Sequence, residues 1–120
     1  MTAEVAPASG VNALPRAIRR ATAYIEENLA APISVTQIAD AARISVRTLE
    51  YAFRRHFSTT PGAYLRVARL RQVNAELRDA DPATTTVADV VRRWGITLQG
   101  RFAAEYRAEF GENPSETLRR

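Results

Sequence analysis

Four polar side chains with recognition chemistry lie within the segment 46–57. Arg47, Glu50, Tyr51 and Arg54 stand at positions i, i+3, i+4 and i+7, which form one continuous stripe on an α-helix. A guanidinium group presents a planar fork of donors that suits guanine and phosphate, and a glutamate can accept from the amine of cytosine. Glu50 could equally orient Arg47 or Arg54 by ion pairing. The stripe therefore has the chemistry to reach the base edges and phosphates of a nucleic acid.

Two short helices joined by a tight turn are predicted to position this stripe. Ser34 precedes Gln37 by three residues, the spacing at which each side chain satisfies the other residue's free backbone N–H at a helix start. Ser45 is a suitable N-cap for the second helix, after a break at Arg43-Ile44. The predicted inward faces are Val35, Ile38, Ala39 and Ala42, then Leu49, Ala52, Phe53 and Phe57. Residues 34–57 are thus predicted to form a helix-turn-helix unit.

The same apolar pattern recurs downstream. At an offset of 52, Val35 pairs with Val87, Ile38 with Val90, Ala42 with Trp94 and Ile44 with Ile96. After one inserted residue, Leu49 pairs with Phe102, Phe53 with Tyr106, Arg54 with Arg107, Phe57 with Phe110, Pro61 with Pro114 and Leu65 with Leu118. A repeat of this length with the same order of elements indicates a duplicated structural unit. A second helix-turn-helix unit is therefore predicted over about 86–110, with Trp94 and Phe102 in its core.

The second unit differs from the first in its outward side chains. Thr86 and Thr97 are the expected N-caps, and Gly95 can adopt the left-handed turn between the helices. The outward stripe is Gln99, Gly100, Ala103 and Arg107, with Arg101 on its flank. Small residues permit a close approach of the backbone to DNA but offer few side-chain hydrogen bonds for reading bases. After Gly111, Asn113-Pro114 is expected to begin a last short helix, with Glu116 three residues after the asparagine.

Three further segments complete the predicted organisation. Residues 1–15 are small and polar without periodicity and are expected to be a disordered tail or a linker remnant. An amphipathic helix is predicted from about Pro15 to Leu29. Pro61 opens a helix to about Ala80, which at 1.5 Å per residue is roughly 28 Å long. Successive major grooves on one face of B-DNA lie about 34 Å apart, so such a helix could hold two recognition helices one turn of DNA apart.

The positive charge is concentrated in the middle of the chain. Residues 41–78 contain eight arginines against two acidic residues, whereas the segments on either side each have a balance of −1. The 17 basic residues are all arginine. A concentrated field of this sign attracts a polyanion and makes binding strongly dependent on salt.

Composition argues against several other classes of function. The chain has 120 residues, no cysteine and one histidine, His56, so thiolate catalysis, disulfides and cysteine metal sites are excluded and no metal or cofactor is expected. Glu50, Glu105 and Glu109 lie on predicted exposed faces, without the buried pairing that acid–base catalysis uses. No apolar run approaches 18 residues, which favours an intracellular, cytoplasmic protein. A helical protein-interaction module without DNA binding remains the alternative, and it predicts binding that does not fall steeply with salt.

Residues 16–120 resemble the DNA-binding domain of the AraC/XylS family of bacterial transcription regulators. The most specific part of the resemblance is the closing pattern Phe102, Tyr106, Phe110, Gly111 and Pro114. It implies an all-α fold of about seven helices, in which two helix-turn-helix subdomains are joined by a long central helix and both recognition helices enter adjacent major grooves. By position it implies DNA contacts in the first unit at Arg47, Thr48, Glu50, Tyr51 and Arg54, and in the second at Gln99, Gly100, Ala103 and Ala104.

The chain departs from the family pattern at Arg43, where a glycine is common in the first turn. Either this turn tolerates backbone strain or Arg43 itself reaches a phosphate. Ile96 replaces a common phenylalanine, which affects only packing volume. Because the second recognition helix has few polar side chains, we expect the first unit to read sequence and the second mainly to clamp the backbone and DNA shape.

The resemblance also implies partners. Promoter DNA is the expected partner, in a cytoplasmic, nucleoid-associated protein, and RNA polymerase is a candidate second partner. Many family members carry an effector-sensing or dimerising domain ahead of this one, and this chain has no room for it. The chain is thus either a short regulator that acts as a monomer or, as we prefer, the C-terminal piece of a longer protein.

Overall fold

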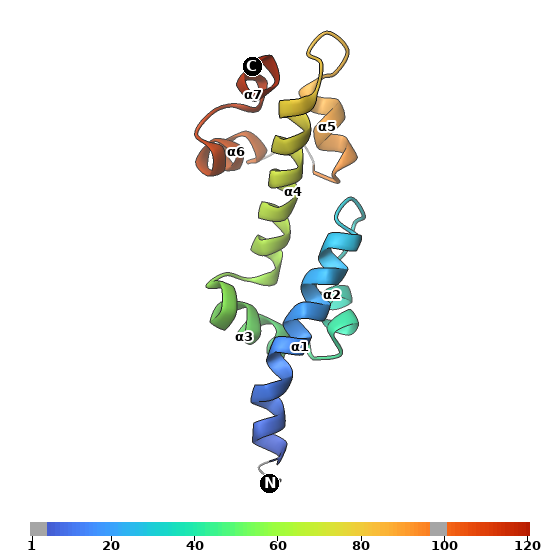
Figure 1. Cartoon of the computed structure of the whole chain (residues 1–120), viewed down its shortest axis with the longest axis vertical. Coiled ribbons are helices and arrows are strands. Elements are labelled where there is room, and N and C mark those ends of the chain that lie inside the picture. The colour runs from blue at the N-terminus through green and yellow to red at the C-terminus, as the bar shows by residue number, and fades with distance from the viewer. Residues whose placement is uncertain (1–4, 97–100) are drawn as a thin grey trace. The chain divides into compact units, whose positions relative to one another are not determined.

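The computed structural model describes residues 5–96 and 101–120, with side chains from Leu14 onward. These residues form seven α-helices and no strand (Figure 1), as the all-α prediction requires. The helices are α1 (Val5–Glu27), α2 (Val35–Ala42), α3 (Val46–Phe57), α4 (Pro61–Asp79), α5 (Val87–Arg93), α6 (Phe102–Phe110) and α7 (Pro114–Arg119). The chain divides into two compact units, unit 1 with residues 1–28 and 33–64 and unit 2 with residues 29–32 and 65–120.

The first helix is longer than the sequence predicts. It was expected to begin near Pro15, after a disordered tail, but α1 begins at Val5 and contains Pro15 in its interior. Pro7 falls in the first turn, where backbone N–H groups have no acceptor within the helix, and Pro15 removes only one hydrogen bond from a segment that is otherwise rich in alanine. The tail prediction therefore differs from the structure over residues 5–15.

Unit 1 contains the first predicted helix-turn-helix. The Ser34 hydroxyl accepts from the N–H of Gln37, and the Gln37 side chain accepts from the N–H of Ser34, so the predicted capping box is confirmed. The Ser45 hydroxyl accepts from the N–H of Thr48, as expected for the start of α3. These caps satisfy backbone donors that would otherwise be unpaired, and they set the first residue of each helix.

The core of unit 1 is built mainly from small and branched side chains. α1 packs chiefly on α2, and its side of the contact includes the fully buried Ala17 and Ala21. Short side chains let two helices approach closely. α3 closes this core with Leu49, Ala52 and Phe53, all fully buried.

One residue of the predicted inward face of α3 is only partly covered. Phe57 is 38% exposed, although its ring contacts those of Phe53 and Tyr64 at centroid distances of 5.2 and 4.9 Å. The reason is its place in the last turn, because Ser58 then ends the helix in a left-handed conformation and the chain turns away. Helical spacing predicts the direction of this side chain but not how much of it is covered.

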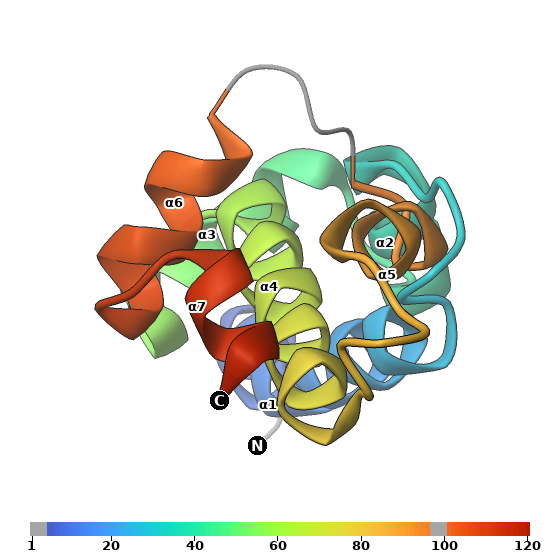
Figure 2. The same ribbon diagram turned by 90° about the horizontal axis from the view of Figure 1, so that it is seen from above.

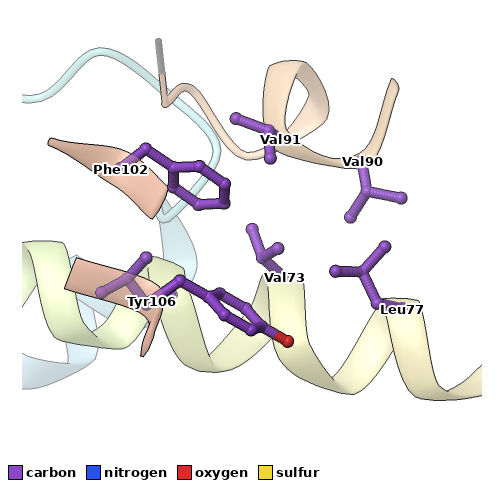
Figure 3. Close-up of a cluster of buried hydrophobic side chains, with 7 residues drawn as sticks. Val73, Leu77, Val90, Val91, Phe102 and Tyr106 are labelled. Carbon is purple, nitrogen blue, oxygen red and sulfur yellow. The ribbon is translucent and has the colours of Figure 1, made fainter. Parts of the chain in front are cut away.

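Unit 2 is organised around the part of α4 that follows Tyr64. In two views, α5 lies on one side of α4, and α6 and α7 lie on the other (Figures 1 and 2). Val73 and Leu77 of α4 face Val90 and Val91 of α5, and the rings of Phe102 and Tyr106 complete the cluster (Figure 3). Trp94 is half-buried against this cluster, and its indole N–H donates to the Glu76 carboxylate at 2.8 Å.

A chain of polar contacts crosses the core of unit 2. The Asn74 amide donates to the Tyr106 hydroxyl, which donates to the Thr117 hydroxyl, both at 2.8 Å. Thr117 in turn donates to the Glu112 carboxylate at 2.6 Å, and Arg120 pairs with Glu112 at 3.0 Å. Tyr106 and Thr117 are almost fully buried, so each hydroxyl has the partners that burial requires. The network joins α4, α6 and α7.

Two further properties concern the whole described part of the chain. Within residues 5–96 and 101–120, no helix combines the length and hydrophobicity needed to cross a membrane. The same residues contain no group of three or more metal-binding side chains.

Candidate nucleic-acid interface

The predicted recognition stripe of α3 lies on the surface of unit 1. Arg47, Glu50, Tyr51 and Arg54 are all exposed, and the exposed fraction of Tyr51 is 56%. They lie on the same helix as the fully buried Leu49 and Phe53. Because one face of α3 is anchored in the core, the polar face is held in a fixed direction.

Thr48 lies beside the stripe and is half-buried. Its backbone N–H donates to the Ser45 hydroxyl, and its own hydroxyl oxygen accepts from Ser45 at 2.9 Å. Since that oxygen accepts in this bond, its proton can be donated to an outside acceptor such as a phosphate. Thr48 thus combines a capping contact with a remaining donor.

The charge of this surface is not neutralised within the described part of the chain. Residues 43–57 contain four arginines and one acidic residue. Among the described residues, no ion pair involves Arg43, Arg47 or Arg54. Arg54, Arg55 and His56 fall in the last turn of α3, where positive charge is favourable to the helix dipole. These guanidinium groups are available to an anionic partner.

The turn before α3 is formed by Arg43 in a left-handed conformation. Its φ is 65° and its ψ is 38°. The N–H of Arg43 donates to the Asp40 carbonyl at 3.0 Å, and the N–H of Ile44 donates to the Ala39 carbonyl at 3.1 Å, which is the Schellman pattern. Of the two alternatives drawn from the sequence, the structure therefore contains the backbone strain. Arg43 is also exposed.

The second predicted interface is only partly described. Gln99 and Gly100 lie outside the described residues, as does the expected cap Thr97. The structure begins α6 at Phe102, with Arg101 in the N-cap position and no side-chain cap bond. This differs from the predicted start after Thr97.

The described outer face of α6 has few hydrogen-bonding side chains. Ala103, Ala104 and Arg107 are exposed, as is Arg101 just before the helix. The Arg107 guanidinium donates to the Asn113 side-chain oxygen at 3.0 Å. The sequence predicts fewer polar side chains on the second recognition helix than on α3, and the exposed side chains of 101–107 agree with this.

Several arginines of unit 2 are engaged within the protein. Arg66 lies 3.9 Å from Glu105, Arg71 lies 3.7 Å from Glu109, and Arg93 pairs with Glu76. The positive balance of residues 41–78 is therefore unevenly distributed. Among the described residues, the arginines of 43–57 have no ion pair, whereas Arg66 and Arg71 of α4 each have an acidic partner.

Arg69 has a different role from its neighbours on α4. Its Nε donates to the Leu29 carbonyl at 2.9 Å and its Nη2 to the Ala31 carbonyl at 2.5 Å. Burial lowers the pKa of this guanidinium from its ordinary value. Arg69 was not among the residues singled out from the sequence, but it lies four residues after the buried Leu65 and four before the buried Val73. Helical spacing alone placed it on the buried stripe.

Arg20 makes the corresponding contact in unit 1, and the sequence analysis did not predict this contact either. Its Nε and Nη2 both donate to the Ala42 carbonyl, at 3.2 and 3.1 Å. Ala42 directly precedes Arg43. No sequence pattern identifies this contact, because the acceptor is a backbone atom 22 residues away.

The two pairs of helices, α2 with α3 and α5 with α6, define a double helix-turn-helix protein. The sequence pattern of the helix-turn-helix domain family matches residues 38–120. A crystal structure of a probable AraC family transcriptional regulator from Rhodopseudomonas palustris CGA009 is similar over 86% of this chain and 94% of that one, with 38% identity and a TM-score of 0.77. The chain belongs to the AraC/XylS family.

Two curated relatives are similar at a comparable level. The probable thc operon regulatory protein of Rhodococcus erythropolis is 40% identical over 107 residues, which cover 89% of this chain and 32% of that protein. The XylDLEGF operon transcriptional activator 1 of Pseudomonas putida is 41% identical over 101 residues, which cover 84% of this chain and 30% of that protein. The chain spans about a third of the length of these relatives.

Proposed function

We propose that this chain binds double-stranded promoter DNA sequence-specifically and regulates transcription, by inserting α3 and α6 into successive major grooves. The observation that carries the proposal is the exposed stripe of Arg47, Tyr51 and Arg54, whose arginines have no ion pair among the described residues, on a helix whose opposite face is buried. A helix presented in this way fits the major groove, where guanidinium groups recognise guanine. The names of the relatives, an operon regulatory protein and an operon activator, support transcription as the process.

The two recognition helices have different tasks in this proposal. α3 reads bases through Arg47, Glu50 and Tyr51, while Arg54 and Arg43 contact phosphates. α6 clamps the backbone with Arg101 and Arg107, and its small Ala103 and Ala104 let the helix approach closely. Backbone contacts position a protein on the duplex, whereas base contacts carry the sequence information.

The proposal involves no catalytic residue, metal or cofactor. RNA polymerase and an effector-binding or dimerisation domain are its further candidate partners. The site of action is the nucleoid in the bacterial cytoplasm.

The test is selection of bound sequences from random duplex DNA at near-physiological salt, followed by the salt dependence of binding to the selected site. We expect an asymmetric site of about 15–20 base pairs with two half-sites about one DNA turn apart, and affinity that falls steeply with salt. Enrichment of one short half-site alone would contradict reading by two grooves. Absence of enrichment with a flat salt dependence would instead favour a protein-interaction module.

Replacing Arg47 with alanine provides the matched test of the stripe. R47A is expected to weaken binding and to relax the selected sequence, whereas R16A removes an exposed arginine of α1 and serves as the charge control. Equal effects of the two variants would mean that total charge, rather than the stripe, accounts for binding.

A further inference from the structure

Each helix-turn-helix turn is supported by an arginine that donates to backbone carbonyls. In unit 1, Arg20 donates twice to the carbonyl of Ala42, the residue directly before the left-handed Arg43. The last carbonyls of a helix receive no hydrogen bond from an N–H of the same helix, so their donor must come from elsewhere. Arg20 therefore fixes the end of α2 at the point where the chain turns toward α3.

In unit 2 an arginine supports the turn indirectly, through a neighbouring segment of backbone. Arg69 donates to the carbonyls of Leu29 and Ala31, on either side of Ala30. The turn residue Gly95 packs on this segment, because a Cβ added to Gly95 would lie 3.3 Å from the Ala30 oxygen and 3.9 Å from the Arg69 guanidinium carbon. Arg69 thus holds the surface against which the second turn rests.

We infer that Arg20 and Arg69 are positioning residues, each of which sets the orientation of one recognition helix through its turn without contacting DNA. The effect of these arginines on DNA binding rests on the proposed function, whereas their effect on the turns does not. Both guanidinium groups use the planar fork of donors, which lysine lacks. Charge alone is therefore insufficient at either position.

The first experiment measures amide hydrogen exchange of the full chain without DNA. R20K is expected to accelerate exchange at Arg43 and Ile44 at least tenfold and to leave Gly95 and Ile96 within twofold. R69K is expected to give the reverse pattern. Each variant is the control for the other, and R16K and R71K replace exposed arginines of the same helices. Equal acceleration at both turns, or none at either, would overturn the inference.

The second experiment is a hydroxyl-radical footprint on the DNA site selected for the unmodified chain. R20K should lose protection of the half-site that R47A also weakens, and R69K should lose protection of the other half-site. If lysine preserves both footprints while methionine abolishes them, the arginines act as phosphate contacts and the inference is overturned. Failure of the unmodified chain to bind DNA would contradict the proposed function, whereas the exchange pattern would still decide whether the arginines position the turns.

Discussion

Arg43 and Gly95 occupy equivalent turns of the two repeats and share the same backbone conformation. Their φ angles are 65° and 73°. In each turn the residue's N–H donates to a carbonyl three residues back, and the next N–H donates to a carbonyl five residues back. The left-handed region costs a residue with a Cβ roughly 1–2 kcal/mol and costs glycine almost nothing. Both repeats thus keep the left-handed conformation at this position, although one has arginine there and the other has glycine.

Replacing Arg43 with glycine is expected to stabilise unit 1. The relieved backbone strain exceeds the extra chain entropy that glycine loses on folding, which leaves a net gain of about 0.5–1 kcal/mol. Thermal unfolding of R43G against the unmodified chain measures the gain. A lower midpoint for R43G would show that contacts of the Arg43 side chain outweigh the strain.

The same variant decides whether Arg43 also reaches DNA. If Arg43 contacts a phosphate, R43G should make the negative slope of log affinity against log salt shallower by about one unit. An unchanged slope would mean that Arg43 acts only in the turn. Thermal unfolding and the salt dependence of binding are independent measurements, because unfolding is measured without DNA.

Replacing Gly95 with alanine is expected to destabilise unit 2 more than the same change at Gly111. Both residues have positive φ, 73° and 78°. Only at Gly95 would the new Cβ meet a backbone atom, the Ala30 oxygen at 3.3 Å, whereas at Gly111 nothing lies within 4 Å. G111A should cost about 1 kcal/mol and G95A clearly more, as measured by denaturant unfolding. Equal costs would show that the segment 29–32 moves aside freely.

Removing the Tyr106 hydroxyl is expected to destabilise unit 2 by roughly 1–3 kcal/mol, the cost of leaving buried polar groups unpaired. Y106F deprives Asn74 of its acceptor and Thr117 of its donor. The matched control is Y51F, whose side chain is 56% exposed and whose change should stay within about 0.5 kcal/mol. Chemical denaturation of both variants makes the comparison, and a neutral Y106F would mean that the network is not coupled to folding.

The two recognition helices are expected to differ in their contribution to sequence discrimination. R47A should lose about 1–3 kcal/mol of preference for the selected base pair, the usual value for a bidentate contact. Q99A, a prediction made from the sequence alone, should weaken binding to all sequences alike. Competition binding with single-base variants of the selected site measures both. Equal loss of discrimination would contradict the division of tasks between the two helix-turn-helix units.

The sequence by itself determined the repeated helices, the caps at Ser34, Ser45 and Thr86, and the outward direction of the α3 stripe. These properties follow from spacing within one helix or from residues three apart, as at Ser34 and Gln37, so no knowledge of distant contacts is required. It also indicated the left-handed turn at Gly95, because glycine favours that conformation locally.

Only the tertiary structure decided what the arginines do. Arg47 and Arg69 are the same residue type on helices, yet one is exposed and the other donates to carbonyls about 40 residues away in the chain. Backbone acceptors leave no trace in the sequence, so neither Arg69 nor Arg20 could be assigned its partner in advance. The partial exposure of Phe57 and the start of α1 at Val5 also escaped prediction, because coverage and helix ends depend on where the surrounding chain goes.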